Sequence, residues 1–120
     1  MRKSVILVDS DPESAAQAKN QLQTVSDVLV ARDCSEALTL LSAQRPSCIV
    51  FDVNLQGTSG TVMYSRIRRT PSLKDIPAVV YTDAGPRPVD FGLGTPVVSK
   101  KSGAVALRSA VEAALCSVAV

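Results

Sequence analysis

The chain has 120 residues, 13 basic and 11 acidic side chains, a formal net charge of +2 and no histidine. Without histidine, neither a Ser-His-Asp triad nor a Cys-His nucleophile can form, and no zinc or haem site can use an imidazole ligand. The small net charge and the aromatic content of 3% predict no nucleic-acid binding, since this needs a basic surface or stacking rings.

The first half of the chain alternates buried strand patterns with helical patterns. The sequence Asp11-Pro12-Glu13 supplies a helix cap, a first-turn proline and an acid near the positive end of a helix. In chain order we predict a strand at Val5–Val8, a helix at Pro12–Gln23, a strand at Asp27–Ala31, a helix from Ser35 to the stop at Arg45-Pro46, and a strand at Ser47–Phe51.

The second half continues this alternation but contains one irregular segment. After a loop at Val53–Thr58 we predict a helix from Ser59-Gly60 through Arg69, strands at Ile76–Tyr81 and Thr95–Ser99, and a helix at about Ser102–Ser117 that carries the apolar residues Val105, Leu107, Val111, Ala114 and Leu115. Residues 83–95 include two prolines and three glycines, which argue against a regular helix. We therefore expect the fourth helix of the fold to be shortened or replaced by an irregular loop.

Strands that alternate with helices at this spacing indicate βαβ units, and therefore a parallel sheet covered on both faces. Right-handed crossovers leave few topologies open. We predict an α/β, flavodoxin-like, doubly wound fold with a five-stranded parallel sheet in the order 2-1-3-4-5. The length and the apolar content of 46% fit one domain over residues 1–120.

The cysteines and the chain start bear on the cellular compartment. Cys34, Cys48 and Cys116 are widely spaced and form no C-x-x-C pair, which predicts reduced, mostly buried thiols. Only four apolar residues precede Asp9, too few for the core of a signal peptide, and no later segment has the length of a membrane span. We expect a soluble, cytoplasmic protein with no membrane partner.

Polar side chains follow the predicted strands at one edge of the sheet. Asp9 and Asp11 come after the first strand, Asp52 after the third, Thr82 after the fourth and Lys100 after the fifth. Ligands of open parallel sheets bind beyond the carboxyl ends of the strands. Carboxylate oxygens suit magnesium, threonine and lysine can donate to phosphoryl oxygens, and an aspartate can form an acyl phosphate.

Four stretches that include these residues resemble the receiver domain of bacterial two-component response regulators, of the chemotaxis-regulator type. They are Val5–Pro12, Ile49–Gly60, Ile76–Thr82 and Val97–Lys100, and the resemblance covers nearly the whole chain. It implies that Asp52 accepts a phosphoryl group from a phosphohistidine on a histidine kinase or a histidine phosphotransfer protein. It also implies that Lys100 pairs with the phosphorylated Asp52 and that Thr82 is the switch hydroxyl.

The resemblance further implies a magnesium ion held by Asp9, Asp52 and the backbone carbonyl of Asn54. Asp11 is an additional candidate ligand, although its place before Pro12 favours helix capping. The output would be a contact with a downstream protein or with further domains of a longer regulator, not a separate catalytic activity.

Several positions depart from the family pattern. Ser10 stands where the family usually has an acid that binds the metal, so we expect weak magnesium binding. Asp83 follows Thr82 in place of a small residue, and Val97 and Lys101 replace an aromatic residue and a proline. These departures leave an alternative open, a pseudo-receiver that binds its partner without phosphorylation. A flavodoxin-like enzyme or nucleotide-binding domain ranks behind both, because the chain lacks the glycine-rich phosphate motifs.

Overall fold

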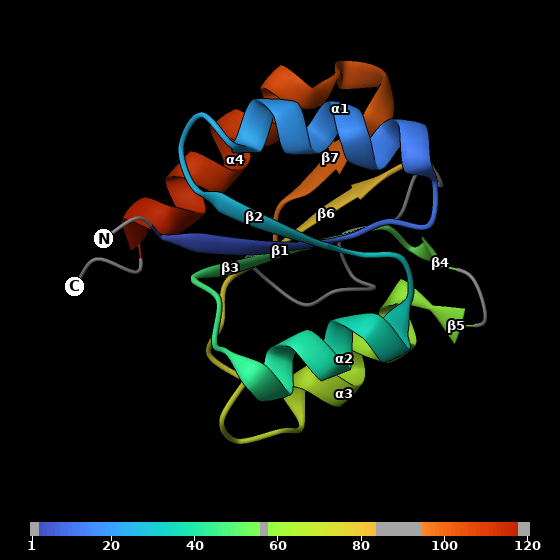
Figure 1. The fold of residues 1–120 in the computed structure, drawn as a ribbon, viewed down its shortest axis with the longest axis vertical. Helices are drawn as coiled ribbons and strands as arrows, with labels where there is room; N and C mark the ends of the chain where they lie inside the picture. Colours follow the sequence, from blue (N-terminus) through green and yellow to red (C-terminus); the bar gives the residue numbers. More distant parts are fainter. Residues whose placement is uncertain (1–2, 56–57, 84–94, 118–120) are drawn as a thin grey trace.

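Five parallel strands form the central sheet of the protein (Figure 1). The computed structural model describes residues 3–55, 58–83 and 95–117. The strand order is β2-β1-β3-β6-β7, which is the predicted order 2-1-3-4-5 of the five long strands, and the α/β class is confirmed with it. The strands are β1 (Ser4–Val8), β2 (Asp27–Ala31), β3 (Cys48–Phe51), β6 (Ala78–Thr82) and β7 (Val97–Ser99).

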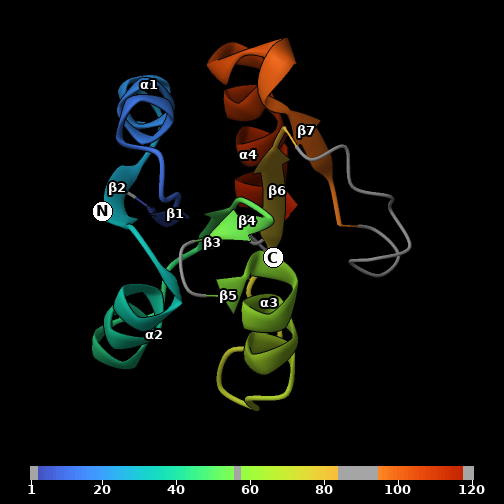
Figure 2. The ribbon, with the colours of Figure 1, turned by 90° about the vertical axis from the view of Figure 1, so that its right-hand side faces the viewer.

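Helices cover both faces of the sheet (Figures 1 and 2). One face carries α1 (Pro12–Leu22) and α4 (Ala104–Ser117), and the other carries α2 (Cys34–Ala43) and α3 (Gly60–Arg68). Because successive strand residues point to opposite faces, each strand feeds two apolar layers. In β1, for example, Ile6 belongs to the layer under α2 and α3, whereas Leu7 belongs to the layer under α1 and α4.

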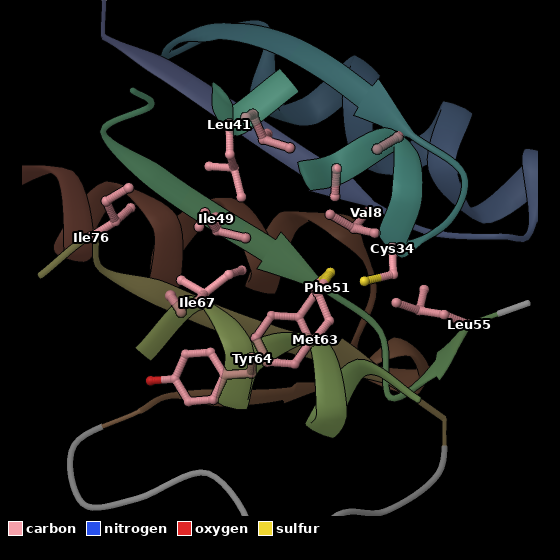
Figure 3. Packing of buried hydrophobic residues seen from close by; sticks show 14 of the residues in the cluster. Val8, Cys34, Leu41, Ile49, Phe51, Leu55, Met63, Tyr64, Ile67 and Ile76 are labelled. Atoms are coloured by element: carbon pink, nitrogen blue, oxygen red, sulfur yellow. The ribbon is translucent and has the colours of Figure 1, made fainter. Parts of the chain in front are cut away.

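The layer under α2 and α3 holds the largest buried ring of the core (Figure 3). Phe51, at the end of β3, stacks on Tyr64 of α3 with the ring centroids 5.2 Å apart. Ile49 and Ile67 are buried in the same layer. The hydroxyl of Tyr64 accepts a hydrogen bond from Arg68 Nε at 2.7 Å. These contacts attach α3 firmly to the strand that ends at residue 51.

Side-chain caps begin three of the helices. Asp11 caps α1 by accepting a hydrogen bond from the Glu13 amide, which confirms its predicted capping role. Ser59 caps α3 in the same way. The second helix begins one residue earlier than predicted, because Asp33 supplies its cap and accepts a hydrogen bond from the Glu36 amide at 2.8 Å.

The loop predicted at Val53–Thr58 is in part an extended ribbon. Asn54–Leu55 (β4) pairs antiparallel with Thr58–Ser59 (β5), and Leu55 is buried in the layer under α2 and α3. The apolar side chains of Leu55 and Val53 draw this segment onto the core.

The last helix begins later than predicted. Lys100–Ser102 forms a short 3-10 helix, η2, which Ser99 caps, and Gly103 then adopts a φ of 88° that interrupts the helical path before α4. Val105, an apolar residue of the predicted helix, is 54% exposed. It lies in the first turn of α4, whereas Leu107 is the first buried residue of that helix.

All three cysteines are free thiols, but Cys116 is exposed, and only Cys34 and Cys48 are buried as predicted. Burial raises the pKa of Cys48 to about 12.

The irregular segment at residues 83–95, which was predicted to replace the fourth helix, lies outside the described residues apart from its two ends. Within the part of the chain that the structure describes, no helix is long and apolar enough to cross a membrane.

Gly60 brings α3 unusually close to the end of β3. A Cβ atom at this position would stand 2.1 Å from the carbonyl oxygen of Asp52 and 2.9 Å from Cδ2 of Phe51. The Gly60 amide donates to the Val53 carbonyl at 2.7 Å. Any larger residue would therefore push the backbone of Asp52 away from the helix.

We expect Gly60→Ala to lower the free energy of unfolding by about 1–3 kcal/mol, the usual cost of overpacking a tight contact. Urea unfolding followed by circular dichroism measures this loss. Ser65→Ala, at an exposed position of the same helix, is the control and should change stability by less than about 0.5 kcal/mol. Equal midpoints for Gly60→Ala and the wild type would show that the close approach is not required.

Candidate functional site

The ammonium group of Lys100 joins two buried carboxylates at the carboxyl end of the sheet. Its Nζ lies 3.0 Å from Asp9 Oδ2 and 2.8 Å from Asp52 Oδ2. Asp9 directly follows β1 and Asp52 directly follows β3, and these two strands are neighbours in the sheet. Asp9 is 2% exposed and Asp52 is 7% exposed. The sequence predicted that these three side chains gather at one edge, and the structure places them in direct contact.

Backbone amides hold the second oxygen of each carboxylate. Asp9 Oδ1 accepts a hydrogen bond from the Asp11 amide at 2.9 Å, and Asp52 Oδ1 accepts one from the Asn54 amide at 3.2 Å. The backbone of both aspartates continues the sheet ladder, since the Asp9 amide donates to Ala31 and the Asp52 amide donates to Val8. Each carboxylate is therefore fixed at both oxygens, one by the chain itself and one by Lys100.

Lys100 reaches this position from η2, directly after β7. Burial by itself would lower the pKa of Lys100, but the hydrogen bonds and charges of Asp52 and Asp9 outweigh burial and raise the pKa above its ordinary value. The ammonium is thus held in its charged form. Lys101, the next residue, is exposed.

The other predicted site residues differ from this cluster in burial and in hydrogen bonding. Thr82 ends β6, is 1% exposed and pairs in register with Ser99. Asn54 and Asp11 are exposed, and the Asp11 side chain accepts the helix-capping hydrogen bond from the Glu13 amide. Ser10 turns its hydroxyl toward the loop after β2, where it donates to the Arg32 carbonyl at 2.7 Å.

Tyr81 is a site residue that the sequence reasoning did not find. It precedes Thr82 in β6, is 5% exposed, and its ring centroid lies 5.9 Å from Lys100 Nζ. Burial raises its pKa, and the carboxylates of Asp9 and Asp83 add to this effect, whereas Lys100 opposes it. The alternation of side chains along β6 could have indicated its position, because it assigns Tyr81 to the apolar layer on the α1 and α4 face.

A shallow pocket of about 270 Å³ opens beside Lys100. Three carboxylates, two ammonium groups and the Tyr81 ring contribute to its wall, so its lining is polar and slightly acidic. The lining residues are Asp11, Glu13, Ser14, Gln17, Tyr81, Asp83, Lys100 and Lys101.

The donor set at the sheet edge suits a hard cation. Asp9 and Asp52 offer two carboxylates close enough to share one ammonium group, and magnesium typically takes one or two carboxylates together with water and phosphate oxygens. Among the described residues, no group of three or more acids, cysteines or histidines could hold a metal ion. A magnesium ion would therefore rely on these two acids and on backbone or water oxygens.

Comparison with known proteins identifies the kind of domain. Residues 5–91 match the family model described as the response regulator receiver domain. Response regulator Rcp1 of Synechocystis sp. is 29% identical over 90 residues, which cover 67% of this chain and 61% of Rcp1. The chain matches less than two thirds of the length of the curated relatives.

Solved structures share the fold over most of the chain. The signal receiver domain of a histidine kinase from Syntrophus aciditrophicus is 26% identical with a TM-score of 0.84, and the match covers 98% of this chain and 92% of that domain. The Mn²⁺-bound form of Rcp1 is 23% identical with a TM-score of 0.77 and coverages of 89% and 90%. The flavodoxin-like architecture predicted for this chain is thus that of known receiver domains.

We expect Lys100→Met to lower the free energy of unfolding at neutral pH by about 1–3 kcal/mol, because two buried carboxylates lose their shared cation. Urea titrations of both proteins measure the difference. Since the pKa of Lys100 is raised, the difference should persist up to the ordinary lysine pKa and disappear as the pH rises through the raised value.

Lys101→Met is the matched control, because Lys101 is the exposed neighbour of Lys100. Its effect should stay below about 0.5 kcal/mol. A loss as large as that of Lys100→Met would mean that general charge, and not the ion pair with Asp9 and Asp52, stabilises this edge.

Proposed function

Because the chain belongs to the response regulator receiver domain family of two-component signalling, we propose that Asp52 accepts a phosphoryl group from a phosphohistidine of a partner protein. One observation carries this proposal: the buried Asp52 carboxylate lies at the carboxyl end of β3, 2.8 Å from the Lys100 ammonium. The donor is a histidine kinase or a histidine phosphotransfer protein, since this chain has no histidine of its own.

The transfer is a displacement at phosphorus. A carboxylate oxygen of Asp52 attacks the phosphorus atom, an O–P bond forms, and the P–N bond of the phosphohistidine breaks. The imidazole nitrogen that leaves takes up a proton. Lys100 stabilises the added negative charge, because its ammonium already lies within hydrogen-bond distance of the accepting side chain.

Magnesium is the cofactor that the donor set favours. Asp9, Asp52 and the backbone carbonyl of Asn54 would hold it, with Asp11 as an additional candidate ligand. Bound there, the ion supplies positive charge for the phosphoryl oxygens. The related response regulator Rcp1 has been solved in an Mn²⁺-bound form, which supports a divalent cation as the cofactor.

Ser10 makes the proposed magnesium site weak. It adds no carboxylate, and its hydroxyl is engaged by the Arg32 carbonyl. An aspartate at this position could not donate to that carbonyl, and a magnesium ion held by Asp9 and Asp52 would attract its carboxylate as a third ligand. Magnesium affinity should therefore depend strongly on residue 10.

The output of the domain is a change in protein contacts. Thr82 is the proposed switch hydroxyl: it is buried at the end of β6, in register with the residue that precedes Lys100. A phosphoryl group on Asp52 would offer this hydroxyl a new acceptor. The recipient is a downstream protein or further domains of a longer regulator, and the domain has no separate catalytic output.

Incubation with a small-molecule phosphodonor and magnesium should add one phosphoryl group, detected by intact mass spectrometry. Asp52→Asn should take up none, because its amide cannot form an acyl phosphate. Asp83→Asn, which alters an exposed acid next to the pocket, should still be labelled. An unlabelled wild type would exclude the proposal and leave the phosphorylation-independent module, and a labelled Asp52→Asn would place the acceptor elsewhere.

For Ser10→Asp we expect an increase in magnesium affinity on the order of tenfold, as a third carboxylate joins Asp9 and Asp52. Isothermal titration calorimetry on both proteins gives the two dissociation constants. Gln17→Glu adds the same charge at an exposed position of α1 and should change the affinity by less than about twofold. An equal gain in magnesium affinity in both variants would show that residue 10 acts only through the general charge of the surface, and not as a ligand.

A further inference from the structure

The flexible side chain of Lys100 is surrounded by more carboxylates than the two it binds. Asp11, Glu13 and Asp83 line the pocket beside it, all three at exposed positions. A lysine side chain has four rotatable carbon links and a compact charge that can serve any of these acids. The ion pairs with Asp9 and Asp52 alone therefore do not explain why the ammonium stays at the sheet edge.

The ring of Tyr81 is a second group that attracts the Lys100 ammonium. The ring centroid is 5.9 Å from Lys100 Nζ, within the range of a cation–π attraction. Tyr81 is 5% exposed and packs in the apolar layer with Val79 and Leu107, so the ring has little freedom to move away. A buried ring beside the ammonium of a flexible side chain limits the positions that the ammonium can take.

The hydroxyl of Tyr81 does not account for this placement. Within the described ranges it makes no hydrogen bond. Among the described residues, Tyr81 contacts the site through the approach of its ring to Lys100. The ring, and not the hydroxyl, is thus the part of the residue that meets the site.

We propose that Tyr81 is a positioning residue for phosphoryl transfer, whose ring holds the Lys100 ammonium between Asp9 and Asp52 and away from the acids of the pocket. The inference rests on the proposed function, since it assigns Tyr81 a role in the reaction at Asp52. Tyr81 touches neither reacting atom and acts through Lys100.

Two substitutions separate the ring from the hydroxyl. Tyr81→Phe keeps the ring, and the rate of phosphate uptake from a small-molecule phosphodonor with magnesium should stay within about twofold of the wild type. Tyr81→Leu removes the ring, and the rate should fall by about 2- to 30-fold, the range of a partly desolvated cation–π contact. A loss in Tyr81→Phe equal to that in Tyr81→Leu, or no loss in either, overturns the proposal.

A double-mutant cycle shows whether Tyr81 acts through Lys100. In a Lys100→Met background, the further change Tyr81→Leu should alter the remaining rate by less than about twofold. Losses that multiply would mean that Tyr81 acts independently of Lys100, which overturns the proposal. Urea unfolding of every variant establishes that the rates belong to folded protein.

Proton NMR spectroscopy tests the contact between Tyr81 and Lys100 without any phosphate. In the unphosphorylated wild type and in Tyr81→Phe, the ring current should shift the Hε protons of Lys100 upfield of those of Lys101. In Tyr81→Leu that shift should vanish, and its absence from the wild type overturns the proposal even where Tyr81→Leu does not fold. If the wild type shows the shift but takes up no phosphate, the proposed function has failed while the contact stands.

Discussion

The ion pairs of the Lys100 ammonium are the interaction on which the edge of the sheet depends. Two carboxylates that are almost completely buried would repel one another without a shared cation, and neither could regain the water it has lost. Lys100 supplies that cation within 3.0 Å of both. It also ties the end of β7 to the ends of β1 and β3, so strands distant in sequence meet at one charged group.

The rest of the site is built around this cluster by the backbone. The amides of Asp11 and Asn54 each hold one oxygen of a neighbouring aspartate, and Gly60 lets α3 pack directly against the carbonyl of Asp52. Phe51 then stacks on Tyr64, which connects the residue before Asp52 to α3. A change in charge at Asp52 would therefore act on a rigidly held side chain and on the elements that hold it, which suits a domain that signals through protein contacts.

Much of the fold was predictable because its signals are local and periodic. Continuous apolar runs marked the buried parallel strands, and their order followed from the alternation with helices. The same order placed Asp9, Asp52 and Lys100 at one edge, since the carboxyl ends of parallel strands meet there. The family match and the strand order confirm the receiver fold, whereas the roles of the individual site residues stay proposals.

Other features were not predictable because they depend on contacts between distant residues. The ribbon of β4 and β5 exists because Leu55 finds a buried position, and the late start of α4 depends on the positive φ of Gly103. The contact of Tyr81 with Lys100 joins β6 to η2, so no local sequence pattern predicts it. Ser10 shows the same limit: the sequence revealed a missing acid, but only the structure showed its hydroxyl bonded to the Arg32 carbonyl.

The most direct test of the central role of Lys100 is a double-mutant cycle on unfolding free energy with Lys100→Met, Asp52→Asn and the combined variant. The two residues share a contact of 2.8 Å at a buried position, so we expect a coupling energy of about 1–3 kcal/mol. Losses that simply add, with a coupling below about 0.3 kcal/mol, would contradict the conclusion that this ion pair organises the edge of the sheet.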